Sequence, residues 1–123
     1  AKNARRFEAG SPNMLSIHAL HASLSLIRDF GIQRIDEKII SNTKYLMNKL
    51  RQLGCEILSP NSECRLSGIV TFRLPDHDQK VIYHQLMDNG VICALRGGGI
   101  RFSPHFYNQV DEFDRACEIL SAL

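Results

Sequence analysis

The 123-residue sequence lacks the features that mark membrane and secreted proteins. Its longest apolar stretches are interrupted by His18, His21 and Ser25, so no segment approaches the roughly 20 continuous apolar residues of a membrane span. No signal-peptide pattern opens the chain. We therefore expect a soluble, cytoplasmic protein with no membrane partner.

Dense positive charge is also missing. The formal net charge is only +2, and no run of lysine and arginine forms a footprint for a polyanion. Nucleic acid is therefore not expected among the partners.

The four cysteines lack the spacing of a metal site. Cys55, Cys64, Cys93 and Cys117 include no C-x-x-C pair and no histidine at zinc-finger distance, so we expect no bound metal. A chain of this length with 44% hydrophobic residues can build a core without disulfides, which favours free thiols.

What the sequence does contain is regular hydrophobic periodicity along a single domain, residues 1–123. Helical spacing predicts helices at about 12–28, 33–53, 76–88 and from 108 onward, and β-branched or apolar runs predict strands at 55–58, 68–74, 91–95 and 100–103. Paired strands between helices indicate an α+β fold, with a small mixed or antiparallel sheet covered by helices on one face.

The expected helix boundaries follow from capping residues. The expected N-caps are Ser11, Asp76 and Asn108, and the expected helix ends are Gly31 and Gly54. The first helix is apolar on two opposite faces, so it should pack on more than one side or against something absent from this chain.

Arg101 is the most unusual residue of the predicted sheet. In the stretch IRFSPHFYN (100–108) it alternates with Ile100 and Phe102, so its side chain should point to the opposite face from theirs. If that face is solvent, Arg101 is an ordinary surface charge. If it lines a cleft, the guanidinium suits a carboxylate or phosphate, and the aromatic residues that follow would wall the site.

Two other segments could bind anions. Arg96 and the three glycines after it form either an anion-binding nest or a flexible turn between strands. Ser11, placed at a helix N-terminus, could receive a phosphate through its hydroxyl and the free backbone N–H groups.

Two stretches together resemble one known family. RFEAGSPN (6–13) before an apolar helix, and ALRGGGIRFSPHFYN (94–108) before an acidic one, are similar to segments of class V aminotransferase-fold enzymes, which use pyridoxal phosphate. The resemblance covers essentially the whole chain and implies the small C-terminal domain of a fold type I enzyme.

The resemblance implies roles for three residues. Arg101 matches the arginine that holds the α-carboxylate of an amino acid substrate, and Arg96 matches a second arginine near the substrate. Ser11 stands where the family usually has a threonine that contacts the cofactor phosphate in the neighbouring subunit of a homodimer.

The resemblance also implies that the chemistry needs a partner domain. The cofactor-bearing lysine and the acidic residue at the pyridine nitrogen belong to the family's large domain, upstream of RFEAGSPN. None of the chain's lysines has the expected surroundings; they are Lys2, Lys38, Lys44, Lys49 and Lys80. No catalytic residue is therefore expected in this chain, which should be inactive alone and a piece of a longer protein.

Several reactions stay open at this point. Cys93 does not match the catalytic cysteine of the cysteine desulfurases, whose loop is replaced here by three glycines, so a desulfurase of the familiar kind is not expected. Transamination, epimerisation, C–X lyase and kynureninase-like chemistry all remain. The alternative from another class is a standalone α+β module that binds a small anion at RGGGIR without catalysis.

Overall fold

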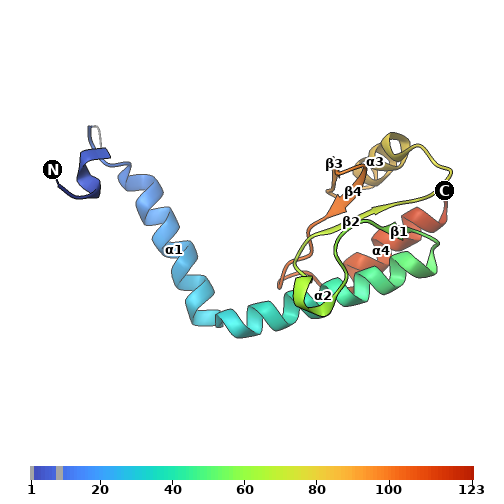
Figure 1. Cartoon of the computed structure of the whole chain (residues 1–123), viewed down its shortest axis with the longest axis horizontal. Helices are drawn as coiled ribbons and strands as arrows, with labels where there is room; N and C mark the ends of the chain where they lie inside the picture. Colours follow the sequence, from blue (N-terminus) through green and yellow to red (C-terminus); the bar gives the residue numbers. More distant parts are fainter. Residues whose placement is uncertain (1, 8–9) are drawn as a thin grey trace. The chain divides into compact units, whose positions relative to one another are not determined.

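A computed structural model describes residues 2–7 and 10–123 of the chain (Figure 1). The internal contacts divide the chain into two compact units, residues 1–34 and 35–123. The single domain expected from the sequence stays a prediction.

The first unit contains the short 3-10 helix η1 (Ala4–Phe7) and the helix α1 (Met14–Phe30). Asn13 is the N-cap, because its side chain accepts a hydrogen bond of 3.1 Å from the N–H of Ser16. The predicted cap at Ser11 is wrong, since the chain makes a tight turn at Pro12 before the helix begins. The predicted end is confirmed: Gly31 has φ 98° and donates its N–H to the carbonyl oxygen of Ile27.

No residue of α1 is buried. Leu15 is 83% exposed and Leu26 is 65% exposed, although apolar side chains of a helix are normally covered by a neighbouring element. This exposure agrees with the expectation that the helix packs against something absent from the chain. Among the described residues, no helix combines the length and apolar character needed to cross a bilayer.

The second unit is built on a four-stranded antiparallel sheet with the strand order β1-β2-β4-β3. The strands are β1 (Glu56–Ile57), β2 (Val70–Arg73), β3 (Ala94–Arg96) and β4 (Gly99–Phe102). The helices are α2 (Ile32–Gln52), η2 (Glu63–Arg65), α3 (Gln79–Asp88) and α4 (Val110–Ser121). The predicted α+β class is therefore confirmed.

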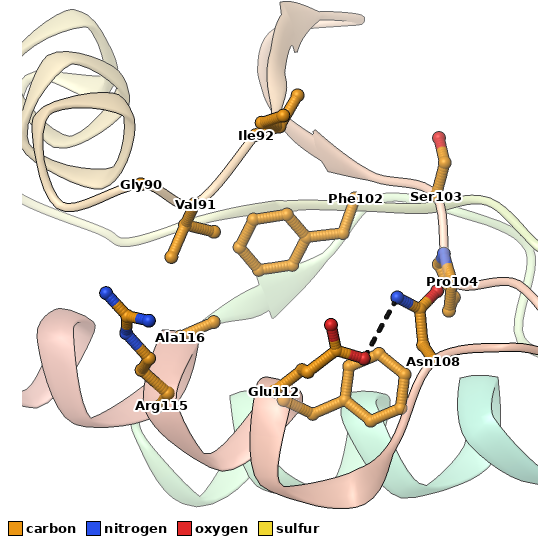
Figure 2. Close-up of a pocket in the computed structure, with 11 residues that line it drawn as sticks. Gly90, Val91, Ile92, Phe102, Ser103, Pro104, Asn108, Glu112, Arg115 and Ala116 are labelled. Atoms are coloured by element: carbon orange, nitrogen blue, oxygen red, sulfur yellow. Dashed lines mark hydrogen bonds between the residues drawn. The ribbon is translucent and has the colours of Figure 1, made fainter.

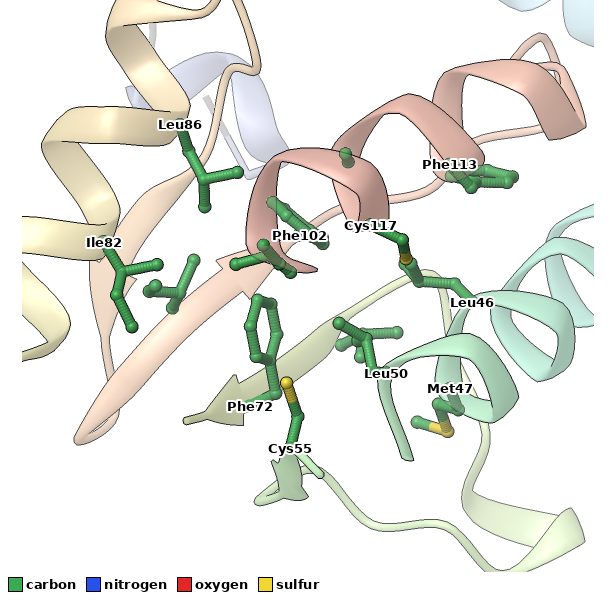
Figure 3. Packing of buried hydrophobic residues seen from close by; sticks show 14 residues of the cluster. Leu46, Met47, Leu50, Cys55, Phe72, Ile82, Leu86, Phe102, Phe113 and Cys117 are labelled. Atoms are coloured by element: carbon green, nitrogen blue, oxygen red, sulfur yellow. The ribbon is translucent and has the colours of Figure 1, made fainter. Parts of the chain in front are cut away.

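One face of the sheet carries the hydrophobic core (Figure 3). Val70 and Phe72 of β2 alternate onto this face, and Ile100 and Phe102 of β4 lie beside them. Helices α2, α3 and α4 all contribute buried side chains to the same cluster. The opposite face, reached by the alternate residues of each strand, contributes none of the cluster's strand residues. Because α2, α3 and α4 of the second unit pack on the core face, we call the opposite face the helix-free face of this unit.

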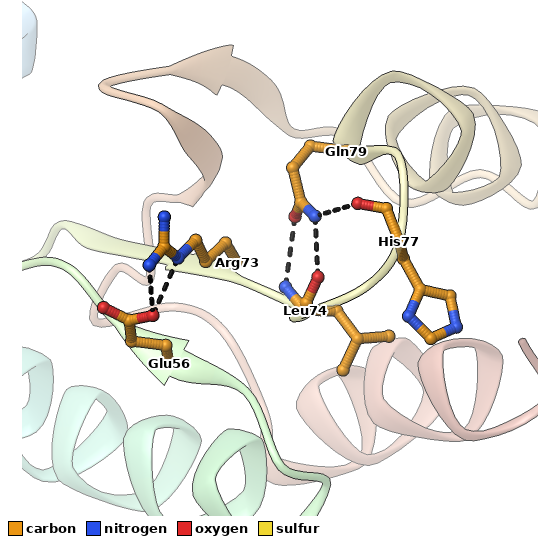
Figure 4. A network of polar contacts seen from close by, with 5 residues as sticks. All are labelled: Glu56, Arg73, Leu74, His77 and Gln79. Atoms are coloured by element: carbon orange, nitrogen blue, oxygen red, sulfur yellow. Dashed lines mark hydrogen bonds and ion pairs between the residues drawn. The ribbon is translucent and has the colours of Figure 1, made fainter.

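The start of α3 differs from the prediction by two residues. Asp78 is the N-cap and accepts a 2.8 Å hydrogen bond from the N–H of Lys80, so the predicted cap at Asp76 is wrong. Asp76 instead adopts φ 63° in the turn after β2. The amide of Gln79 pairs with both backbone groups of Leu74, at 3.1 and 2.8 Å, and so extends the end of β2 (Figure 4).

The start of α4 is shifted by one residue. Gln109 is the N-cap, and its N–H donates to the carboxylate of Glu112 at 2.7 Å. The predicted cap at Asn108 is wrong because its side-chain oxygen accepts the N–H of His105 instead, at 2.8 Å. Asn108 therefore closes the turn between β4 and α4.

Two predicted strands begin later than expected because their first residues form hydrogen bonds with the preceding helix end. The N–H of Val91 donates to the carbonyl oxygen of Leu86 and closes α3, so the predicted strand 91–95 becomes Ala94–Arg96. The N–H of Cys55 likewise donates to Leu50, next to the left-handed Gly54 that was predicted to end α2.

Candidate functional site

The helix-free face of the sheet presents Arg101 at its centre. Arg101 is half-buried in β4, with Thr71 of β2 and Ala94 of β3 as its direct neighbours across the sheet. Ile100 and Phe102 are buried on the other face, which confirms the predicted alternation. The core therefore fixes the strand that carries the guanidinium.

Two buried polar atoms near this position have no hydrogen-bond partner within residues 2–7 and 10–123. They are Nε of Arg101 and Nδ1 of His105, both in the stretch 100–108. An unsatisfied buried donor or acceptor costs about 1–3 kcal/mol, and such groups gather where a ligand completes the hydrogen bonding. Among the described residues, the stretch 100–108 is therefore where unsatisfied buried polar atoms most clearly indicate a ligand.

Arg96 lies on the same face as Arg101. Ala94 is the direct partner of Arg101, and Arg96 follows Ala94 by two residues, so strand alternation puts both arginines on one side. Arg96 is exposed, and neither arginine belongs to an ion pair of the described residues. The third arginine of this face, Arg73, is neutralised by Glu56 at 2.7 Å (Figure 4).

The three glycines form a tight β-hairpin between β3 and β4. Gly97 and Gly98 have φ 64° and 79°, the left-handed values that a two-residue turn requires. A Cβ at Gly99 would collide with the carbonyl oxygen of Phe72 on β2. The geometry supports the turn interpretation of RGGG. Positive φ favours glycine at positions 97 and 98, and lack of space requires it at position 99.

The turn after β4 is anchored by a residue that the sequence did not single out. Asn42 of α2 is 2% exposed, and its amide donates to the carbonyl oxygens of His105 (2.9 Å) and Asn108 (3.2 Å). Sequence reasoning did not consider that a short amide side chain on a helix can donate hydrogen bonds to the backbone carbonyl oxygens of a neighbouring turn.

The neighbouring Thr43 holds a second segment. It is fully buried, and its hydroxyl donates to the carbonyl oxygen of Ser67 at 2.9 Å, just before β2. Asn42 and Thr43 together therefore attach the segments beside β2 and β4 to α2.

An aromatic cluster follows the arginine, as predicted. The ring of His105 stacks on Tyr107 with centroids 4.5 Å apart, and its centroid lies 4.8 Å from that of Phe106. These rings contact one another in the segment between β4 and α4.

A pocket of the second unit lies away from the two candidate arginines (Figure 2). It has a volume of about 310 Å³ and is lined by Phe102, Phe113 and Ala116 of the core side, with Asn108 and Glu112 at 3.2 Å from each other. Arg96 and Arg101 do not line it.

Two lysines of the second unit, Lys44 and Lys49, do not fit the cofactor-bearing role. Lys49 pairs with Asp114 at 2.9 Å, and this hydrogen bond raises the pKa of Lys49. Lys44 pairs with Glu63 at 3.2 Å. A lysine that forms a Schiff base needs a lowered pKa, which desolvation and like charge provide. Lys44 and Lys49 are instead held in ion pairs.

The four cysteines are free, as predicted. Burial raises the pKa of Cys55 to about 11 and raises the pKa of Cys93 and of Cys117 as well. Reactive cysteines have the opposite shift, so these three are structural. The described residues contain no group of three or more metal-ligating side chains placed to hold an ion.

Ser11 is exposed in the first unit, three residues before α1. Glu8 and Ala9 of the motif RFEAGSPN lie outside the described residues. The serine hydroxyl keeps the exposure that contact with a phosphate requires.

Comparison with known proteins identifies the class to which this fold and site belong. The family model described as "Aminotransferase class-V" matches residues 1–115, and the chain therefore belongs to that family. Its members are enzymes that depend on pyridoxal phosphate.

Particular relatives span more than one activity. The chain is 30% identical, over 99% of its length, to an uncharacterized aminotransferase of Bacillus subtilis (strain 168), YcbU, of which it covers 32%. It is also 30% identical over its whole length to a kynureninase of Bacillus cereus, of which it covers 30%. The chain thus spans about a third of the length of these curated relatives.

The fold has close counterparts among solved structures. The apo structure of a cysteine desulfurase from Thermococcus onnurineus NA1 superposes with a TM-score of 0.91 at 22% identity, over 99% of this chain and 34% of that one. This similarity confirms that the chain has the fold of the corresponding segment of a fold type I enzyme.

Proposed function

We propose that the chain is the small C-terminal domain of a larger pyridoxal-phosphate enzyme that acts on an amino acid, and that Arg101 binds the substrate's α-carboxylate. The observation that carries the proposal is the unsatisfied, buried Nε of Arg101 on a helix-free face of the sheet. A carboxylate is the partner that a guanidinium holds best, through two parallel hydrogen bonds.

The chain's own residues contribute binding and orientation. Arg101 fixes the carboxylate end of the substrate, because Ile100 and Phe102 lock its strand into the core. His105 and Tyr107 stack on each other in the turn that follows this strand. Pyridoxal phosphate, when bound, supplies the electron sink for the bonds at the substrate Cα.

Ser11 has the proposed role of a phosphate ligand. Its exposed hydroxyl, placed before the N-terminus of a 17-residue helix, fits a phosphate of the cofactor. We assign this contact to the neighbouring subunit of a homodimer, as the family resemblance implies.

The remainder of the active site belongs to a large domain. The exposed apolar side chains of α1 support such a partner, because an uncovered helix of this kind is costly in water. The paired lysines, Lys44 and Lys49, support a lysine from that domain as the cofactor-bearing residue. The chain alone is accordingly expected to be inactive.

The reaction catalysed by the whole enzyme is transamination, epimerisation or C–X lyase chemistry. The raised pKa of Cys93 and the two-residue turn at Gly97 and Gly98 argue against persulfide chemistry on Cys93.

The test uses the full-length gene product. It should bind pyridoxal phosphate, seen as a visible absorbance band, and Arg101→Ala should weaken its apparent affinity for the amino acid substrate by about 30-fold or more. Arg73→Ala is the matched control, because Glu56 already occupies that guanidinium. Unchanged affinity in Arg101→Ala would refute the assignment.

The second candidate function is an anion-binding module that works without the rest of an enzyme. It is motivated by two arginines on one face without a carboxylate partner in the described part of the chain. It requires that the 123-residue chain is a stable monomer by size-exclusion chromatography and that small carboxylates or phosphate raise its melting temperature. The preferred proposal expects self-association through α1 and no shift.

A further inference from the structure

We propose that the pocket of the second unit binds a free, zwitterionic α-amino acid with an apolar side chain (Figure 2). Arg101 does not line this pocket, and the proposal does not depend on the function proposed for that residue. The pocket is lined by the segment after α3, the end of β4 and the first turns of α4. Its volume of about 310 Å³ is at the lower end of the range of small-molecule sites.

Two opposite charges face the pocket without pairing with each other. Glu112 and Arg115 both line it, and both side chains point into it from α4 (Figure 2). Neither belongs to an ion pair of the residues that the structure describes. Side chains three residues apart on a helix are neighbours, with Cβ atoms about 5–6 Å apart, and opposite charges at this spacing normally attract each other. Other hydrogen bonds hold these two side chains.

Glu112 is held through one of its two oxygens. Its Oε2 accepts the N–H of Gln109 at 2.7 Å and the side-chain amide of Asn108 at 3.2 Å. Its Oε1 has no hydrogen bond within residues 2–7 and 10–123. Both partners are uncharged, so they fix the carboxylate without compensating its charge. One oxygen thus remains to accept a hydrogen bond from a ligand.

Arg115 is held at the other end of the pocket. Its Nη2 donates to the carbonyl oxygen of Asn89 at 3.0 Å, next to the lining residue Gly90. A carbonyl orients the guanidinium but carries no net charge. Because a guanidinium has five N–H donors, the donors that remain can hold a carboxylate.

The rest of the lining is largely apolar. Phe102, Phe113 and Ala116 are buried residues of the core that also line the pocket, and Val91 and Ile92 follow them along the wall. An aliphatic side chain is stabilised by contact with such a surface, because it is removed from water. The pocket therefore combines a cation, an anion and an apolar surface.

This combination selects a zwitterion. In an α-amino acid the ammonium nitrogen and the carboxylate carbon are bonded to the same carbon and lie about 2.5 Å apart. Both groups can therefore lie between Glu112 and Arg115, with the ammonium at the glutamate. A ligand with only a negative charge would be repelled by Glu112, and one with only a positive charge by Arg115. Both side chains are exposed, so we expect a dissociation constant on the order of 1 mM.

The test records methyl NMR spectra of the full-length protein, labelled with carbon-13 at alanine, during titration with L-leucine. The methyl of Ala116 reports on the pocket, and the methyl of Ala94, the sheet partner of Arg101, reports on the helix-free face. The matched ligands are 4-methylpentanoate, which lacks the ammonium, and 3-methylbutylamine, which lacks the carboxylate. We expect L-leucine to shift the Ala116 signal saturably and each matched ligand to bind there at least about fivefold more weakly.

Variants then locate the charges that recognise the ligand. Glu112→Gln keeps a side chain that suits the capping box and removes the charge, and Arg115→Gln removes the opposite charge. Each should weaken the response of Ala116 by about fivefold or more. Asp111→Asn is the matched control, because Asp111 is in the same helical turn but does not line the pocket, and it should leave the affinity within about twofold. Unchanged positions of the other methyl signals confirm that each variant is folded.

The outcomes separate this proposal from the function proposed for Arg101. An Ala116 signal that L-leucine does not shift at any soluble concentration refutes the site, whatever Ala94 does. Equal binding of L-leucine and the two matched ligands, or binding that survives both Glu112→Gln and Arg115→Gln, refutes recognition of a zwitterion. Arg101→Gln should leave the response of Ala116 unchanged, and loss of that response would show that the signal reports on the other face.

Discussion

Asn42 of α2 donates a hydrogen bond of 2.9 Å to the carbonyl oxygen of His105, which lies 63 residues further along the chain. A second bond from the same amide reaches Asn108 at 3.2 Å. The turn that follows the strand of Arg101 is thereby attached to the helix under the sheet. A buried side chain far away in sequence thus determines the local geometry beside the candidate site.

Replacement of Asn42 by alanine should lower the free energy of unfolding. It leaves two carbonyl oxygens near a buried position without their donor, which costs about 1–3 kcal/mol. Urea denaturation followed by circular dichroism measures the change. Asn48→Ala is the control: Asn48 is exposed on the same helix, and its loss should change stability by less than about 0.5 kcal/mol. Equal effects of the two substitutions would refute the anchoring role.

Gly99→Ala should also destabilise the fold, for a steric reason. Its new Cβ would collide with the carbonyl oxygen of Phe72, and backbone of a central strand cannot move aside cheaply. We expect a loss of about 1–3 kcal/mol in the free energy of unfolding. In the same hairpin, Gly98→Asn should be nearly neutral, since Gly98 faces open space and asparagine tolerates its left-handed backbone. A neutral Gly99→Ala would show that the strands are further apart than described.

Acid stability should depend on Asp114. Hydrogen bonds from Lys49 and then from Tyr45 lower the pKa of Asp114. Because the folded-state pKa lies below the ordinary value of about 3.9, this carboxylate stabilises the fold above that pH, and the contribution is lost as the pH falls through the folded-state pKa.

Asp114→Asn should therefore flatten the acid side of the stability profile. Urea midpoints measured from about pH 7 to about pH 2 should fall less steeply in Asp114→Asn than in the wild type. The exposed Asp36 provides the control, and Asp36→Asn should keep the wild-type slope. Identical slopes for wild type and Asp114→Asn would contradict the assigned pKa shift.

Thiol reactivity should distinguish one cysteine from the others. Cys64 is exposed, whereas Cys55 and Cys117 are buried with raised pKa values. Alkylation with iodoacetamide at about pH 7.5, read by peptide mass spectrometry, should modify Cys64 first and the two buried thiols only on unfolding, because the thiolate is the reacting form. Rapid labelling of Cys55 or Cys117 in the folded protein would contradict this burial. Cys64→Ser should abolish the fast phase.

Much of the fold could be predicted from the sequence because local patterns agree with tertiary structure here. Alternation in 100–103 predicted the face of Arg101, and glycines predicted the ends of α1 and α2, since those signals act over a few residues. Capping was less predictable. Asp76 and Asn108 are residue types that often cap helices, yet Asp78 and Gln109 are the N-caps. Asp76 lies in the turn after β2, and the side chain of Asn108 accepts the N–H of His105 instead.

The candidate site was predictable only in part. Arg101 and Arg96 stand out as charges within or beside a strand, and the family resemblance assigned them roles. Asn42 did not stand out, because its partners lie more than sixty residues away. Likewise, no local pattern shows that Glu56 neutralises Arg73 and leaves the other two arginines without a partner in the described chain. Such pairings depend on which strands become neighbours.

The central claim is that Arg101 recognises a substrate carboxylate. The most direct test compares the dissociation constants of the full-length enzyme for its amino acid substrate and for the corresponding carboxamide, in wild type and in Arg101→Gln. We predict that the wild type prefers the carboxylate by about 30-fold or more and that Arg101→Gln abolishes the preference. A preference of the same size in both proteins would contradict the account.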